Sequence, residues 1–279
     1  MDHKGHHLSS LLHRLILLGL ILAGSLPGSL ASAAPRESVA SVASRPGVTQ
    51  GYYLIEPEGP PRAIALLFVG GEGVVGIEQG RLPKITNNFL MRARLQLAAK
   101  GLLLAYPDTP SDHRQGLGSF RIAVEHAEDI AAVVKAMKAY ADLPVFLIST
   151  SRGTISAANG AARLPPGAVT GLVLTSAITV RGNRGQASIY DLPMKDIKPP
   201  VFVLAHKDDG CYVSPAGNMP ALLDAMPAAS RKTSLTLTGG TTRSGGDACG
   251  GQSAHGYLGV EDQAVKAITE WIDAVLTGR

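Results

Sequence analysis

Short apolar runs alternate with longer amphipathic stretches along most of the chain. Runs of about four to eight apolar residues bounded by glycine or proline are typical of buried strands, whereas helices extend over about ten residues or more. The runs expected to form strands are residues 51–55, 63–69, 102–106, 145–149, 169–175, 201–205 and 234–237. The stretches expected to form helices are residues 88–100, 121–140, 153–163 and 261–276. This alternation predicts an α/β fold in which helices flank a mostly parallel central sheet.

The N-terminal segment has a different pattern. Basic residues Lys4 and Arg14 precede an apolar run over residues 15–23, and Ala31-Ser32-Ala33 has the small-x-small form of a signal peptidase site. The run is shorter than the ~20 apolar residues that span a bilayer. We therefore expect residues 1–33 to be a cleaved signal peptide rather than a retained anchor, with the protein exported to the periplasm or secreted.

The remaining chain is expected to have two parts. Residues 34–49 are rich in alanine and serine, and they predict a flexible mature N-terminus. Residues 50–279 are long enough for a single domain with a buried core. Between the strands expected at 169–175 and 201–205, about 25 residues leave room for a small lid over 180–198, but not for a large cap domain.

Composition and charge narrow the possible functions. Hydrophobic residues make up 45% of the 279 residues and charged residues 17%, which excludes a disordered chain. Removal of the signal peptide takes away two basic residues and one acidic residue, so the net charge of +4 becomes +3. The basic residues are dispersed, and no Lys/Arg block indicates a nucleic-acid partner. No later stretch predicts a membrane span.

The apolar run at 145–149 leads into a turn that contains a candidate catalytic serine. Ser151 follows this run, with the small residues Ser149 and Gly153 two positions before and after it. The segment resembles the nucleophile elbow of the α/β-hydrolase superfamily, usually written G-x-S-x-G, in which a serine occupies a strained strand-to-helix turn. Ser149 departs from the family's first glycine, but it is also small. Ser149 itself is the second candidate nucleophile, although Ser151 would then replace the second glycine.

The resemblance implies an acid and a histidine that follow the serine in chain order. Asp209, after the strand expected at 201–205, best matches the family's acid position, and Asp208 is the alternative. His255 precedes the last expected helix and is the only histidine after the acid. His126 lies on the apolar stripe of its expected helix and is interpreted as a core residue.

The resemblance also implies an oxyanion hole, in which backbone N–H groups bind the developing negative charge. One donor would be the N–H of Arg152, directly after the nucleophile. The other would be the N–H of Gly71 or Glu72, in the glycine-rich loop that follows the strand expected at 63–69. Val69 stands where the family frequently has histidine.

Two further features concern the surroundings of this site. Cys211 and Cys249 are the two cysteines of the chain, and in an oxidising compartment a lone pair is usually a disulfide. This bridge would tie the acid loop to the histidine loop. His113 and Arg114 lie in a polar loop at the C-terminal end of an expected strand, where α/β folds build their sites. We expect them to line the substrate pocket, although an ordinary surface arginine remains an alternative for Arg114.

The resemblance implies cleavage of an ester, thioester or amide through an acyl-serine, without a metal or an organic cofactor. The absence of a large cap favours a small or exposed carboxylic ester as the partner, as in the carboxylesterase and dienelactone-hydrolase-like branches. Dienelactone hydrolases usually carry cysteine at the elbow, so Ser151 argues against that particular activity. The alternatives are a peptidase or acyltransferase with the same triad, and a non-catalytic binding protein that has kept the fold.

Overall fold

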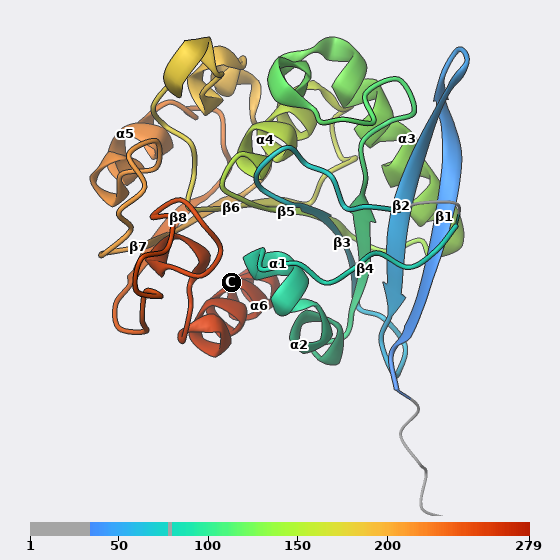
Figure 1. Cartoon of the computed structure of the whole chain (residues 1–279). Helices are drawn as coiled ribbons and strands as arrows, with labels where there is room; N and C mark the ends of the chain where they lie inside the picture. The colour runs from blue at the N-terminus through green and yellow to red at the C-terminus, as the bar shows by residue number, and fades with distance from the viewer. Residues whose placement is uncertain (1–33, 78–79) are drawn as a thin grey trace, which may run out of the picture. The chain divides into compact units, whose positions relative to one another are not determined.

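The centre of the molecule is an eight-stranded sheet with strand order β1-β2-β4-β3-β5-β6-β7-β8 (Figure 1). The computed structural model describes residues 34–77 and 80–279, so the expected signal peptide lies outside the described residues. The strands are β1 Arg36–Arg45, β2 Val48–Glu56, β3 Ala63–Phe68, β4 Leu102–Pro107, β5 Val145–Thr150, β6 Gly171–Thr175, β7 Val201–His206 and β8 Lys232–Leu237. β2 pairs antiparallel with β1 and β4, and the other pairs are parallel. The predicted mostly parallel sheet is confirmed.

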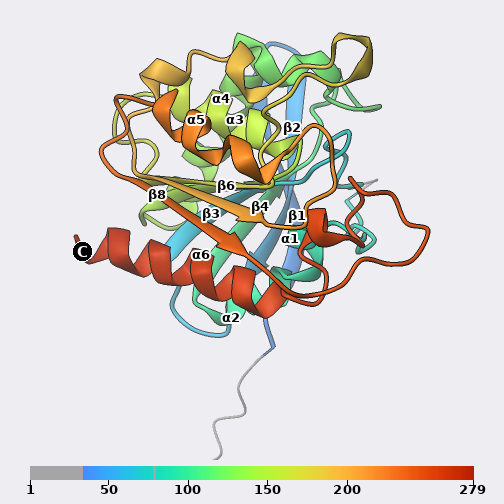
Figure 2. The ribbon, with the colours of Figure 1, turned by 90° about the vertical axis from the view of Figure 1, so that its left-hand side faces the viewer.

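Helices cover both faces of the sheet (Figures 1 and 2). One layer contains α1 Phe89–Arg92, α2 Arg94–Ala99 and α6 Glu261–Leu276, and the other contains α3 Val124–Tyr140, α4 Gly153–Arg163 and α5 Met219–Asp224. Within β3, Leu66 packs into the core on the side of α3 and α4, whereas Leu67 packs into the core on the side of α1 and α6. Because both faces are covered, the central strands β3 to β7 are buried at every position, and most of their residues are apolar rather than only alternate ones.

The expectation of a flexible segment over 34–49 is wrong, because most of this segment forms β1 and the start of β2. β1 pairs along its whole length with β2. It is also held to α3, because the Nε of Arg45 donates to the buried carboxylate of Asp129 at 2.9 Å. The folded unit therefore begins before residue 50, and β2, which contains the strand expected at 51–55, has a neighbouring strand on each side.

Differences elsewhere are smaller. The helix expected over 88–100 is divided into α1 and α2 at Ala93. The helix expected from residue 121 begins at Val124, after the 3₁₀-helix Gly118–Ile122.

The segment between β6 and β7 is not a large cap. It contains the short 3₁₀-helices Asn183–Gly185, Ile189–Asp191 and Met194–Asp196. Ile189 and Ile197 are fully buried in the core on the side of α4, so this segment packs as part of the domain. Among the described residues, we find no helix with the length and apolar character needed to cross a bilayer.

Candidate active site

Ser151 lies in the sharp turn between β5 and α4, as the sequence predicts. Its φ is 53°, in the left-handed region that non-glycine residues seldom occupy. A side chain at Gly153 is excluded, because its Cβ would lie 2.0 Å from the carbonyl oxygen of Phe68. A Cβ at Gly70 would similarly lie 2.9 Å from that of Ser151. The tight approach of β3, its following loop and α4 therefore requires glycine and holds Ser151 in a strained conformation.

Ser149 fits the elbow in spite of its departure from the family pattern. Its side chain is buried within the sheet, where Oγ donates a 2.9 Å hydrogen bond to the carbonyl of Val173 on β6. The hydroxyl thus has a partner on the neighbouring strand. This position accommodates a small polar side chain, and it directs that side chain into the sheet.

Asp209 and His255 lie against each other. The distance from His255 Nδ1 to Asp209 Oδ2 is 2.9 Å, and the two side chains are 3% and 1% exposed. The other carboxylate oxygen of Asp209 accepts the backbone N–H of Cys211 at 2.9 Å. Asp208 is exposed, and its backbone N–H donates to His206. Of the two candidate acids, the structure brings Asp209 to the histidine.

Ser151 and His255 line one cavity of about 250 Å³, together with Gly70, Gly71 and Cys249. His255 Nε2 is buried and has no hydrogen-bond partner within the described part of the chain. In sites without substrate, catalytic hydrogen bonds are often long or poorly aligned, and they shorten when the complex forms. The imidazole is therefore held on its Nδ1 side, while its Nε2 is unpaired among the residues that the structure describes.

The loop expected to supply oxyanion donors lies beside Ser151. Gly71 has a φ of 58° and lines the cavity with Gly70. The side chains of Glu72 and Arg152 form an ion pair of 2.5 Å, which joins the loop after β3 to the residue after Ser151. Arg152 is also the N-cap residue of α4, so its N–H lies at the positive end of that helix.

Three polar residues at the site have no motif that singles them out in the sequence. Ser214 Oγ lies 3.0 Å from both Asp209 Oδ2 and His255 Nδ1. Ser176, with a φ of 46° after β6, donates from Oγ to the carbonyl of His255 at 2.8 Å. Tyr257 donates to the carbonyl of Leu204 at 2.8 Å, and burial raises the pKa of its phenol. These contacts hold the histidine loop against the ends of β6 and β7.

The predicted disulfide is present, since Cys211 and Cys249 are bridged. Cys211 follows Asp209 in the acid loop, and Cys249 precedes His255 in the loop before α6. The bridge therefore joins covalently the two loops that carry the acid and the imidazole.

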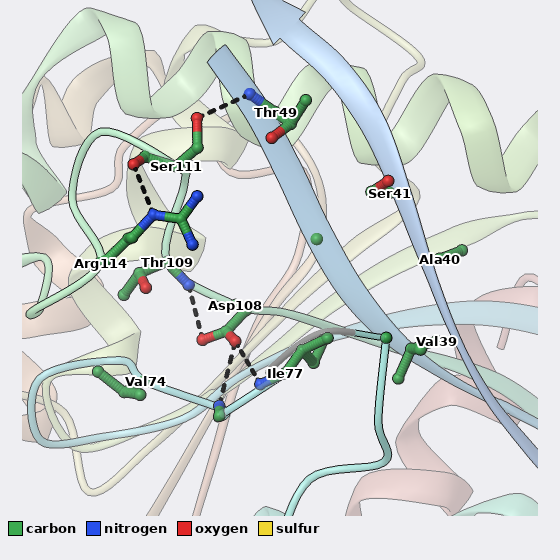
Figure 3. A pocket seen from close by; sticks show the side chains of 13 residues that line it. Val39, Ala40, Ser41, Thr49, Val74, Ile77, Asp108, Thr109, Ser111 and Arg114 are labelled. Carbon is green, nitrogen blue, oxygen red and sulfur yellow. Dashed lines mark hydrogen bonds between the residues drawn. The ribbon is translucent and has the colours of Figure 1, made fainter.

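The structure does not bring His113 and Arg114 to the cavity of Ser151. The ring of His113 stacks on Phe120, with centroids 3.8 Å apart. Arg114 lines a second cavity of about 390 Å³ between the β1–β2 hairpin and the loop after β3 (Figure 3). At the base of that cavity, the carboxylate of Asp108 accepts the backbone N–H groups of residues 75–77.

Within residues 34–77 and 80–279, no cluster of three or more His, Cys, Asp or Glu side chains has a geometry suited to a metal ion. The chemistry that can be assigned to the cavity is that of a hydroxyl, an imidazole, a carboxylate and backbone N–H groups.

Comparisons with known proteins give a clear result for the fold alone. No protein-family model matches the chain, and no curated protein sequence matches it. A cold-adapted esterase from an Arctic intertidal metagenomic library is 16% identical, with a TM-score of 0.57 over 85% of this chain and 94% of that chain. Dienelactone hydrolase from Anabaena variabilis is 15% identical, with a TM-score of 0.59 over 86% and 97%. An acylaminoacyl peptidase from Pyrococcus horikoshii is 13% identical, with a TM-score of 0.61 over 87% of this chain and 42% of that chain.

These structural likenesses show that the chain has the α/β-hydrolase fold. They confirm at the level of the fold the resemblance that the turn around Ser151 indicates.

Proposed function

We propose that this protein is a serine hydrolase that cleaves a carboxylic ester or thioester through an acyl-enzyme on Ser151. The observation that carries the proposal is the 2.9 Å contact between His255 Nδ1 and Asp209, with Nε2 unpaired in the cavity that Ser151 lines. A serine hydroxyl is a weak nucleophile until a neighbouring base takes its proton. An imidazole anchored on one nitrogen, beside a serine in a strained turn, is suited to that role.

The proposed reaction has two halves. In the first, His255 Nε2 takes the proton of Ser151 as Oγ attacks the acyl carbon, and the imidazolium returns this proton to the departing alcohol. In the second, His255 takes a proton from water, which attacks the acyl-serine, and then returns it to Ser151 as the acid is released. Asp209 fixes the tautomer of His255 with the proton on Nδ1 and stabilises the imidazolium.

The negative charge on the tetrahedral intermediate is assigned to backbone donors. The N–H of Arg152 is one, and the N–H of Gly71 or Glu72 is the other. Losing one such donor costs about 3 kcal/mol of transition-state stabilisation in a serine hydrolase. The ion pair between Glu72 and Arg152 supports this assignment, because it holds both donor segments together.

Ester cleavage is favoured over the alternatives by the site and by its structural neighbours. Within the described residues, the segment between β6 and β7 forms no large cap, and the cavity is small. Two of the neighbours named above are an esterase and a dienelactone hydrolase. Because an acylaminoacyl peptidase is also among the structural neighbours, amide cleavage is the second candidate function.

The test compares p-nitrophenyl esters of short and long acyl chains with aminoacyl amides, in wild-type protein and in Ser151→Ala. We expect ester hydrolysis, covalent labelling by a fluorophosphonate probe, and loss of both in Ser151→Ala, with kcat lower by at least about 10⁴-fold. Ser149→Ala is the matched control, since its hydroxyl bonds within the sheet. Activity that survives Ser151→Ala would refute the mechanism, and an unlabelled, inactive wild type would favour a binding protein.

We also propose that the protein is exported. The disulfide between Cys211 and Cys249 fits an oxidising compartment. The basic and apolar pattern of residues 1–33 fits a signal peptide.

A further inference from the structure

Arg121 is a buried cation directly behind the expected oxyanion loop. It lies in the 3₁₀-helix Gly118–Ile122, and it is 1% exposed. Within the described residues, no carboxylate forms a salt bridge with its guanidinium. Burying a charge without an opposite charge is costly, so such a group persists only where its hydrogen bonds compensate. Burial and the charge of Arg152 lower the pKa of Arg121 to about 9, which leaves it protonated at neutral pH.

The hydrogen bonds of Arg121 connect the oxyanion loop to the nucleophile helix. Nη2 donates to the carbonyl of Gly71 at 3.1 Å and, over a longer distance of 3.4 Å, to that of Val69. Nη1 donates to Oγ of Ser156 on α4 at 2.6 Å. A Cβ at Gly73 would lie 2.7 Å from Nη2, so the loop packs directly on the guanidinium.

Because of the geometry of the peptide group, these contacts determine which way the neighbouring N–H groups point. In a trans peptide the C=O and the following N–H point in opposite directions. With the carbonyls of Val69 and Gly71 turned toward Arg121, the N–H groups of Gly70 and Glu72 point away from it. Gly70 and Gly71 line the cavity with Ser151. A donor on each carbonyl also polarises the amide and strengthens its N–H as a donor.

We propose that Arg121 is a positioning residue for the oxyanion hole, holding the carbonyls of Val69 and Gly71 so that the N–H groups of this loop face the developing oxyanion. The inference rests on the proposed function. The ion pair between the side chains of Glu72 and Arg152 holds the same loop. The loop is therefore fixed relative to Ser151 through both its backbone carbonyls and the side chain of Glu72. Arg121 contacts no reacting atom, and its effect passes through the loop.

The test is Arg121→Lys, which keeps a positive charge but lacks the planar fork that reaches both carbonyls and Ser156. The matched control is Arg62→Lys, directly before β3, where the Arg62 guanidinium donates to the carbonyl of Lys100. Ser156→Ala removes one partner of Arg121 and leaves the loop contacts intact. Each protein is assayed for kcat and KM on a neutral p-nitrophenyl ester, for inhibition by a trifluoromethyl ketone, and for thermal unfolding.

We expect Arg121→Lys to lose about 10- to 100-fold in kcat with KM changed less than about threefold. Its affinity for the trifluoromethyl ketone, which forms a tetrahedral oxyanion on the serine, is expected to fall by a similar factor. Ser156→Ala and Arg62→Lys are expected to stay within about threefold of wild type in kcat.

A lower Tm with kcat and inhibitor affinity unchanged in folded Arg121→Lys would overturn the proposal and leave Arg121 a purely structural role. If Arg121→Lys does not fold, Arg121→Gln, whose amide still donates to one carbonyl, is expected to show the same selective loss, and its absence overturns the proposal. A wild-type protein without ester hydrolysis or labelling would instead overturn the proposed function itself.

Discussion

The buried polar residues Arg121, Ser156 and His126 behind the site are joined by hydrogen bonds. Arg121 has only donors, so Ser156 Oγ must accept from it and direct its own proton elsewhere. His126 Nε2 lies 2.8 Å from that Oγ, and which of the two atoms donates depends on the tautomer of His126. Burial and the charge of Arg121 lower the pKa of His126 to about 3, so this histidine is neutral at pH 7.

The low pKa of His126 predicts that the free energy of unfolding decreases in acid. An unfolded histidine has a pKa of about 6.5. Between pH 6.5 and 3, the unfolded state therefore binds more protons at His126 than the folded state does. The contribution of the neutral His126 to the stability of the fold is intact above pH 6.5 and is lost as the pH falls. By linkage, the loss between pH 7 and pH 4.5 is about 2 to 3 kcal/mol. In His126→Gln, whose side-chain amide can either accept from or donate to Ser156, urea unfolding at the two pH values should show a difference smaller by about 2 kcal/mol. An equal pH dependence in both proteins would contradict the assignment.

At the scale of elements, the acid loop after β7 is joined by Cys211–Cys249 to the glycine-rich histidine loop before α6. The bridge closes a loop with a sequence separation of 38 residues. In the chain-entropy model, such a closure stabilises the fold by about 4 kcal/mol. Cys211 also provides the backbone N–H that binds Asp209. The bridge therefore supports both the fold and the placement of the acid.

We expect the double variant Cys211→Ser/Cys249→Ser to unfold at a lower temperature and to lose about 10-fold or more in kcat/KM, because the two loops separate more easily. Thermal unfolding and ester hydrolysis, measured with and without a reductant, check this expectation. The reductant should affect the wild type in the same direction and leave the double variant unchanged. Full activity of a well-folded double variant would show that the loops are held by other contacts.

The pattern of the sequence predicts the buried parallel strands well, because their apolar runs depend on burial alone. β1 is not visible in that pattern, since its alanines and serines become a strand only through pairing with β2 and the contact of Arg45 with Asp129. The glycines and the small residue around Ser151 are predictable, because a tight turn demands them locally. Ser214 and Arg121 are not, because their contacts with His255 and Gly71 join positions 41 and 50 residues apart in the chain.

The positions of His113 and Arg114 show a second limit of sequence reasoning. The loop that carries them follows the C-terminal end of β4. This end lies on the same side of the sheet as the C-terminal end of β5. However, β3 lies between β4 and β5, and two strand spacings amount to about 10 Å. Because of this separation, Arg114 lines a different cavity from Ser151. Strand order depends on tertiary packing and cannot be read from apolar runs, so the sequence does not predict this separation.

For the molecule as a whole, the N-terminal segment and the disulfide together suggest where folding is completed. β1 begins at Arg36, so a chain cut after Ala33 would keep the entire strand that covers β2. The bridge forms readily where thiols are oxidised, and cytosolic reductants oppose it. The proposed export and removal of the leader would therefore leave the sheet intact and allow the two loops to be joined.

We expect the full-length chain, expressed in a bacterial host, to be recovered from the periplasm with Ala34 as its first residue and with a mass that indicates no free thiol. N-terminal sequencing and intact-mass measurement with and without reductant check both points. Ala33→Arg is the control, because a signal peptidase requires a small residue at that position and the variant should retain its leader. The same chain expressed without residues 1–33 should remain reduced in the cytosol, and its ester hydrolysis should rise when the bridge is formed in vitro. Recovery of uncut protein, or of exported protein with two free thiols, would contradict the coupling of export to the construction of the site.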